Sequence, residues 1–569
     1  MTGNHSLKFG GDVRYANNLR VASGVPRNGI LIFLPTRTGL FGPQGGGGLA
    51  LASFLLGDPF TFSRSASSVT DAGERQRRWF LYGQDTWRVT PKLTVNGGLR
   101  WEIYEPEWVN GLRRGGFVDF TTGNVRVAGV GRIGLNMNVE NSFRNFAPRL
   151  GVSYQLGPKT VVRLGAGRTF DIGVFGTAFG HVVTQNLPVL AVQQVEAPAV
   201  WERAFNLAQG PPPPDFGGPV PESGLLPLPA GIGQTLRPLK MRMPTVDSWN
   251  LSVQHAIAPA LTVELAYVGS KTTHGFVSEG PSYNCNEPTG QGFAQGIPRS
   301  QRRPFFQKFG WTQDLNCYLN NGSSSFHSLQ ARIEKRFSRG VQFQANYTLS
   351  KALTYGGEYF AIDPRVSYGP VDFDRAHQIN VTALWELPVG RKRRFGSSAP
   401  RALDWFVGGW QLATLTTWLS GLPFTPRYLF CDFDRDTGPC RPDRVGDPRV
   451  GGGRNGWFAV ATEPLVANGM ASGPWRRPQV GQFGSVGRNS LRGPGFFQAD
   501  LSVMKSFVLS RSVRATVRAD IFNVFNVVNL GLPDVCVDCN LGTAGKITST
   551  ASLNNTPQRQ VQFAVRLEF

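Results

Sequence analysis

The sequence contains few charged residues and no long hydrophobic run. Charged residues make up 17% of its 569 residues. No stretch of about 18 or more apolar residues occurs, which excludes a transmembrane helix. The amino terminus, MTGNHSLKFGGDVRYANN, lacks the apolar centre of a signal peptide and already has the pattern of a strand. Aromatic residues still form 11% of the chain, so intrinsic disorder is a poor interpretation.

Catalytic motifs are also missing. The six histidines are scattered, without HExxH or triad-like spacing: His5, His181, His255, His274, His327 and His377. The glycine run at 45–48 lacks the lysine of a phosphate-binding loop, and a flexible turn is the better interpretation. We therefore expect no enzymatic activity and no cofactor.

The chain is basic, with 59 Lys and Arg against 38 Asp and Glu and a net charge of +21. One interpretation is attraction to an anionic partner such as lipid, lipopolysaccharide or nucleic acid. The other is a basic composition spread through a polar interior and loops. Most of the basic residues are arginines scattered along predicted strands, and the one dense run is Arg391 to Arg394 in a predicted turn. No nucleic-acid-binding motif is visible, so nucleic acid is not an expected partner, and the dispersed basic composition is the favoured interpretation.

The six cysteines all lie in predicted loops. Their even number and local spacing favour disulfides Cys431–Cys440 and Cys536–Cys539, with Cys285–Cys317 as a third candidate. A metal site at the CVDC segment is the weaker alternative, because neither a second CxxC nor a nearby histidine completes it.

Alternation with a period of two is the main positive signal. In the last nine residues, VQFAVRLEF, the apolar positions run from Val561 to Phe569 in steps of two, and small or polar residues lie between them. A strand with this pattern has one apolar and one polar face. Outer-membrane barrels consist of such strands and many end in an aromatic residue. We therefore interpret Phe569 as a signal for the barrel-assembly machinery.

The connections between alternating segments are of two kinds. Short turns are predicted near 90–92, 157–159, 258–260, 338–340 and 510–511, and long segments separate the resulting hairpins. Short turns on one side and long loops on the other are typical of outer-membrane barrels. The predicted strands are 5–17, 28–36, 50–64, 76–89, 92–105, 147–156, 160–170, 246–257, 261–270, 327–337, 341–351, 378–387, 409–420, 496–507, 512–525 and 559–569. The expected fold is an all-β transmembrane antiparallel barrel with long extracellular loops, and outer-membrane lipid and lipopolysaccharide are its expected partners.

Several blocks, in order along the chain, resemble TonB-dependent outer-membrane receptors of the Oar-like group. They include RWFLYGQDTWRVTPKLTVNGGLRWE at 78–102, SLQARIEKRFSRGVQFQANYTLSKAL at 328–353 and GRNSLRGPGFFQADLSVMKSF at 487–507. The resemblance implies a barrel of about twenty-two strands, filled by an amino-terminal plug and energised through TonB. Residues 1–569 would then be the carboxy-terminal part of such a barrel, about sixteen strands. The plug, the carboxypeptidase-regulatory-like domain, the signal peptide and the TonB-contacting segment would lie in a missing amino-terminal region.

Two loop regions offer candidate sites. Asp432, Asp434 and Asp436 alternate as in a calcium loop, but Thr437 replaces the expected glycine, and a disulfide-closed acidic loop is the favoured alternative. The loop 271–325 is the first place to look for contacts with a small extracellular ligand. Its aromatic candidates are Tyr283, Phe305, Phe306, Trp311 and Tyr318.

The expected function is uptake of a siderophore-, saccharide- or peptide-sized ligand through the cell outer membrane. Two alternatives stay open. One is a passive porin-like or adhesive barrel that acts without TonB. The other is a basic secreted β-protein that binds an anionic polymer.

Overall fold

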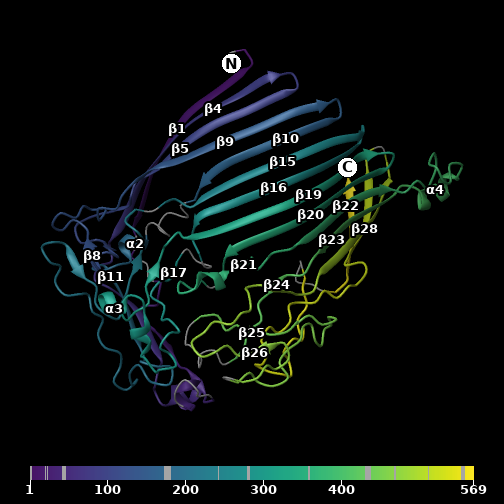
Figure 1. Ribbon diagram of the computed structural model, residues 1–569. Helices are drawn as coiled ribbons and strands as arrows, with labels where there is room; N and C mark the ends of the chain where they lie inside the picture. The colour runs from purple at the N-terminus through teal and green to yellow at the C-terminus, as the bar shows by residue number, and fades with distance from the viewer. Residues whose placement is uncertain are drawn as a thin grey trace.

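The computed structural model describes residues 3–19, 21, 24–40, 47–171, 181–240, 242–277, 282–356, 359–429, 438–466, 469–510, 512–552 and 558–569. Its main feature is a sixteen-stranded antiparallel sheet, in which fourteen long strands follow one another in chain order (Figure 1). These strands are β1 (His5–Leu19), β4 (Gly73–Thr90), β5 (Leu93–Tyr104), β9 (Ser142–Gly157), β10 (Thr160–Phe170), β15 (Thr245–Ala258), β16 (Leu261–Gly275), β19 (Gly322–Ser338), β20 (Val341–Tyr355), β22 (His377–Glu386), β23 (Trp410–Leu419), β28 (Phe496–Val508), β29 (Arg514–Phe522) and β30 (Gln560–Glu568). Two short strands, β6 (Trp108–Val109) and β21 (Tyr368–Pro370), pair beside this series.

One face of the sheet is apolar across many strands. The register pairs Leu349 with Leu329 and Tyr347 with Ile379, so apolar positions of neighbouring strands lie side by side. Large side chains on this face are solvent-exposed, among them Leu265, Ile333 and Val565. An exposed apolar surface of this extent indicates contact with lipid.

The opposite face is polar and points to the interior. On β19 it carries Arg332 and Glu334, whose side chains form an ion pair of 2.6 Å between Nη2 and Oε2. At the long-loop end of this face, Phe80 of β4 and Tyr104 of β5 are packed in a core with Phe117 from the loop after β5. Because the loops fold against the polar face, that face is the inner one.

The sheet has two free edges in the described part of the chain. There, β1 pairs with β4 on one side, and β30 pairs with β29 on one side. The sheet is therefore open along the outer sides of β1 and β30.

The predicted strands 28–36 and 50–64 are wrong as strands of the large sheet. Residues 50–64 begin with helix α1 (Ala50–Leu55), because the sequence ALASFL lacks a period of two and contains strong helix formers. The neighbouring β2 (Ile30–Ile32) and β3 (Thr61–Ser67) belong instead to a separate four-stranded sheet. In it β2 pairs with β3, β3 with β11 (Leu190–Glu196), and β11 with β13 (Ile232–Gly233). The other predicted strands are confirmed, with ends that differ by up to five residues.

The long loops gather at one end of the strands and contain the remaining small sheets (Figure 1). Their strands are β7 (Gly116–Val118), β8 (Asn124–Val127), β12 (Leu225–Pro227), β14 (Thr235–Leu236), β17 (Tyr283–Asn284), β18 (Asn316–Cys317), β24 (Pro423–Phe424), β25 (Asp443–Arg444), β26 (Trp475–Arg476) and β27 (Leu491–Arg492). Short helices in these loops are η1 (Pro35–Thr38), α2 (His181–Thr184), η2 (Arg299–Arg302), α3 (Phe306–Phe309) and η3 (Pro364–Ser367). Each loop region buries its own apolar side chains, for example Trp311 and Leu226 in one cluster and Trp475 and Phe458 in another.

At the other end of the strands, one connection is longer than the rest. The segment between β22 and β23 contains helix α4 (Arg401–Val407), which projects from the sheet (Figure 1). None of the described helices is long and apolar enough to cross a membrane.

Candidate ligand site in the long loops

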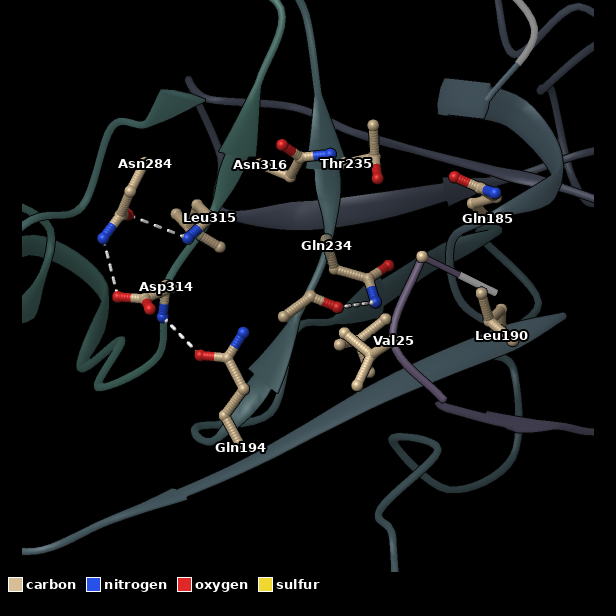
Figure 2. A pocket seen from close by; sticks show the side chains of 13 residues that line it. Val25, Gln185, Leu190, Gln194, Gln234, Thr235, Asn284, Asp314, Leu315 and Asn316 are labelled. Atoms are coloured by element: carbon tan, nitrogen blue, oxygen red, sulfur yellow. Dashed lines mark hydrogen bonds between the residues drawn. The ribbon is translucent and has the colours of Figure 1, made fainter. Parts of the chain in front are cut away.

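A cavity of about 280 Å³ lies among the long loops (Figure 2). Five small strands of the loops (β11, β13, β14, β17 and β18), together with the chain near Val25, form its walls. The lining residues are Gly24, Val25, Gln185, Leu190, Val192, Gln194, Gly233, Gln234, Thr235, Asn284, Asp314, Leu315 and Asn316. Side-chain amides therefore dominate the polar part of the lining.

Backbone pairing and a disulfide fix one wall of the cavity. Strand β18 pairs with β14 in parallel and with β17 in antiparallel orientation, which places Asn316 opposite both Thr235 and Asn284. A disulfide joins Cys285, next to β17, to Cys317 in β18. A covalent link across such short strands restricts the freedom of the loop and stabilises its folded form.

Buried amides hold a second wall in place. The Asn186 side chain is fully buried, and it both donates to the Thr235 carbonyl and accepts from the Thr235 amide, each at 2.7 Å. The Gln234 Oε1 atom accepts a hydrogen bond from the Leu187 backbone amide at 2.8 Å. These side chains satisfy backbone groups that a neighbouring strand would otherwise bond. The cavity is therefore formed in the absence of a ligand.

Two amide groups of the lining are available to a ligand. Gln194 accepts a hydrogen bond from the Asp314 backbone amide through Oε1 at 2.7 Å, and its Nε2 group has no partner among the described residues (Figure 2). The side chain of Asn316, an exposed residue, likewise makes no hydrogen bond within that part of the chain. A ligand here would meet amide donors and acceptors together with the apolar side chains of Leu190 and Leu315.

The charges at the cavity are compensated within the protein. Asp314 receives a hydrogen bond from Asn284 Nδ2 and forms an ion pair with Arg303, both at 2.6 Å. Arg303 also pairs with Glu196 at 2.7 Å, and Arg299 pairs with Glu196 at 2.9 Å. The two acidic and two basic side chains balance, so the site presents little net charge to a ligand.

The aromatic residues predicted to contact a ligand do not line this cavity, and most of them are buried in the cores of the loops. Tyr283, Trp311 and Tyr318 are buried, and Trp311 packs against Phe309 with ring centroids 4.4 Å apart. Phe305 is half-buried against the same cluster, and Phe306 begins α3. In this structure these side chains stabilise the loops, and a role in ligand contact stays a prediction.

No motif in the sequence marks the residues that line this cavity. Asn284, Asp314 and Asn316 all lie within the predicted loop 271–325. Gln194 and Gln234 come from another loop, and no motif marks them. Only the fold brings the two loops together.

The remaining candidate residues are placed as follows. Cys536 and Cys539 are joined by a disulfide, which leaves no thiolate there for a metal ion. Asp538 between them accepts hydrogen bonds from the Leu429 and Leu465 backbone amides at 2.9 and 3.1 Å. Cys440 is also disulfide-bonded. Cys431, Asp432, Asp434 and Asp436 lie outside the described residues, so the calcium loop and that disulfide partner stay predictions. Phe569 is fully exposed at the end of β30.

His327 and His377 are examples of histidines on the apolar face of the sheet. The His327 ring forms a hydrogen bond of 2.7 Å with the Tyr267 hydroxyl group, and the His377 ring forms one of 2.9 Å with the Tyr347 hydroxyl group. Such pairs satisfy polar atoms at the rim of a membrane surface.

A large antiparallel sheet with an apolar outer and a polar inner face, short turns at one end and long loops at the other defines an outer-membrane β-barrel. The comparison with known families agrees. The model of the outer membrane beta barrel domain matches residues 1–562, and the chain belongs to this family. Its location is the outer membrane.

Solved structures with a similar course of the chain include receptors and a transporter. A ferric enterobactin receptor from Pseudomonas aeruginosa is 11% identical, with a TM-score of 0.43, over 99% of this chain and 51% of that chain. The ferripyoverdine receptor of the same organism is 11% identical, with a TM-score of 0.39, over 90% of this chain and 40% of that chain. An iron transporter from Neisseria meningitidis is 8% identical, with a TM-score of 0.41, over 100% of this chain and 54% of that chain. The chain thus spans about half the length of these proteins. No protein of curated function matches the sequence.

Proposed function

We propose that this chain is the ligand-binding barrel of a TonB-dependent receptor, and that the cavity among the long loops captures a small ligand at the cell surface. The observation that carries the proposal is the amide-lined cavity formed by Gln194, Gln234, Asn284 and Asn316. The family match, the polar interior face and the Oar-like sequence blocks support the rest. In receptors of the resembled group, energy reaches the ligand through a plug and TonB, and we assign neither contact to residues of this chain.

The chemistry of the lining favours an uncharged polar ligand. Amide groups donate and accept hydrogen bonds, as hydroxyl-rich and peptide-like molecules require. An anionic ligand would need an unpaired cation in the site, and Arg303 already binds Asp314 and Glu196. We therefore place oligosaccharides and short neutral peptides ahead of anionic ferric siderophores.

Replacing Gln194 or Asn316 by leucine should weaken binding. Each change removes one amide that faces the ligand, and a net hydrogen bond is worth about 0.5–1.5 kcal/mol, or about two- to tenfold in affinity. Isothermal titration of the purified chain against a neutral oligosaccharide, a neutral tripeptide and a ferric siderophore measures the effect. Gln209→Leu is the matched control, because Gln209 is exposed in a loop outside the cavity.

The same titration separates the proposal from its alternatives. Binding of one neutral probe that the two cavity variants weaken, and the control does not, would support a receptor. Binding that none of the variants changes would place the ligand elsewhere. Failure of every probe to bind, together with ion conductance in a planar bilayer, would favour a passive porin-like barrel.

A further inference from the structure

The connection from 387 to 409 combines basic and aromatic residues at the short-turn end of the sheet. It contains five basic residues, Arg391 to Arg394 and Arg401, and one acidic residue, Asp404, for a net charge of +4. The side chain of Asp404 accepts a hydrogen bond from the Arg391 backbone amide, so it ties the basic run to α4.

Helix α4 is attached to the outer face of the sheet. The Trp405 ring lies 4.8 Å from the ring of Phe507 on β28. Lys505 donates to the Trp405 carbonyl and lies 5.4 Å above the Trp410 ring. Trp410 pairs with Lys505 in the sheet, and its indole donates to the Phe406 carbonyl at 2.9 Å. The helix therefore continues the lipid-facing surface beyond the ends of the strands.

The apolar side chains of this connection are open to solvent. Leu403, Trp405 and Phe406 are 51–65% exposed, and Phe395 is 56% exposed. The four basic residues 391–394 are exposed as well. Nearby residues compensate little of their charge. Arg393 forms an ion pair with Glu386 at 3.4 Å, and Arg394 lies 5.5 Å from the Phe395 ring. A soluble surface gains nothing from such exposed aromatic residues, whereas a membrane interface does.

We propose that residues 387–409 form an interfacial anchor that binds the headgroups of anionic phospholipids in the leaflet at the short-turn end, which faces the periplasm. The aromatic side chains of α4 enter the headgroup region beside the lipid-facing strands, and the basic run contacts the phosphates. Continuity with the lipid-facing surface favours a membrane over a protein as the occupant. The positive charge selects anionic lipid.

Limited proteolysis in nanodiscs tests the anchor, because the protease reaches both sides of the bilayer there. The purified chain is placed in discs of phosphatidylcholine or of phosphatidylglycerol, and mass spectrometry follows trypsin cleavage within 391–394. We expect cleavage about tenfold slower in phosphatidylglycerol, with the protection lost at 1 M salt. Cleavage at Arg449, exposed in a long loop, is the internal control and should proceed equally in both discs.

Two variants make the test specific. Changing all four residues 391–394 to glutamine, with the trypsin site at Arg401 as readout, should abolish the difference between the two discs. A variant with lysine in place of Arg391, Arg393 and Arg394 keeps the charge and should keep the protection. Equal cleavage of the wild-type chain in both lipids would overturn the proposal and would leave a periplasmic protein as the occupant.

Discussion

An arginine at position 345 should destabilise the chain in a bilayer by about 2–4 kcal/mol, whereas an arginine at position 344 should cost about 1 kcal/mol or less. Ala345 lies on the apolar face in the middle part of β20, paired with Ile333 on one side and Val381 on the other. Gln344 is its neighbour on the polar face, paired with Glu334. The two variants differ by one residue along the same strand and by the face on which the new charge lies.

The difference has a simple origin. A guanidinium on the outer face loses its water and is surrounded by hydrocarbon near the centre of the bilayer. On the inner face it stays hydrated beside Glu334. Urea titration of tryptophan fluorescence in lipid vesicles measures both free energies of unfolding. A larger loss for Gln344→Arg than for Ala345→Arg would show that the polar face contacts lipid and would invert the assignment of the two faces.

The second large loss of stability is expected from Arg237→Met in the long loops. Arg237 and Glu107 are buried, at 4% and 1% exposure, with 3.5 Å between Nη2 and Oε2. Gln76 donates to the other Glu107 oxygen at 3.0 Å, and Glu74 is buried nearby. Removing the cation leaves Glu107 beside Glu74 in a buried site. The loss of one partner from such a pair costs about 3–5 kcal/mol.

The cost should depend on pH. Burial raises the pKa of Glu107 from 4.5 to about 7, against the opposing effect of Arg237, while Glu74 adds to the rise and Arg78 opposes it. Because the folded state holds this proton more tightly than the unfolded state, the contribution of Glu107 to stability falls as pH rises from 4.5 to 7. Without Arg237 its pKa rises further. The variant should therefore be little affected at pH 5 and strongly destabilised at pH 8.

Hydrogen exchange of the amides around 107–118 and 232–237 measures this local stability at both pH values. Arg132→Met is the matched control, since Arg132 is exposed in the long loops. This variant should change hydrogen exchange little at either pH. An equal loss of protection at pH 5 and pH 8 would contradict the role of Glu107 protonation.

The large sheet could be predicted because alternation reports the environment of each strand directly. In β20, apolar residues from Val341 to Leu349 alternate with polar residues, because one side of the strand faces lipid and the other faces water. This pattern can be recognised without information from any other part of the chain. The errors lie at 28–36 and 50–64, where short apolar segments pack against another loop. Their structure depends on β11, about 130 residues away, which a local pattern does not reveal.

The candidate site could be predicted only in part for a related reason. Aromatic residues in the loop 271–325 are conspicuous in the sequence, but Tyr283 and Trp311 are large enough to form a core and become buried. The amides that line the cavity are common loop residues, and their position depends on the pairing of β18 with both β14 and β17. The basic run at 391–394 could be found from sequence, whereas the contact of Trp405 with Phe507 next to it could not.

Surface labelling of cells tests whether the chain spans the outer membrane with its long loops outside. One epitope is inserted after Gly218, exposed in the proline-rich long loop, and another after Gly396, exposed in the connection before α4. The chain is expressed in Gram-negative cells behind a secretory signal peptide. Antibody should stain the first epitope on intact cells and the second only after the outer membrane is permeabilised. Staining of the Gly396 epitope on intact cells, or recovery of both tagged chains in the soluble fraction, would contradict this arrangement.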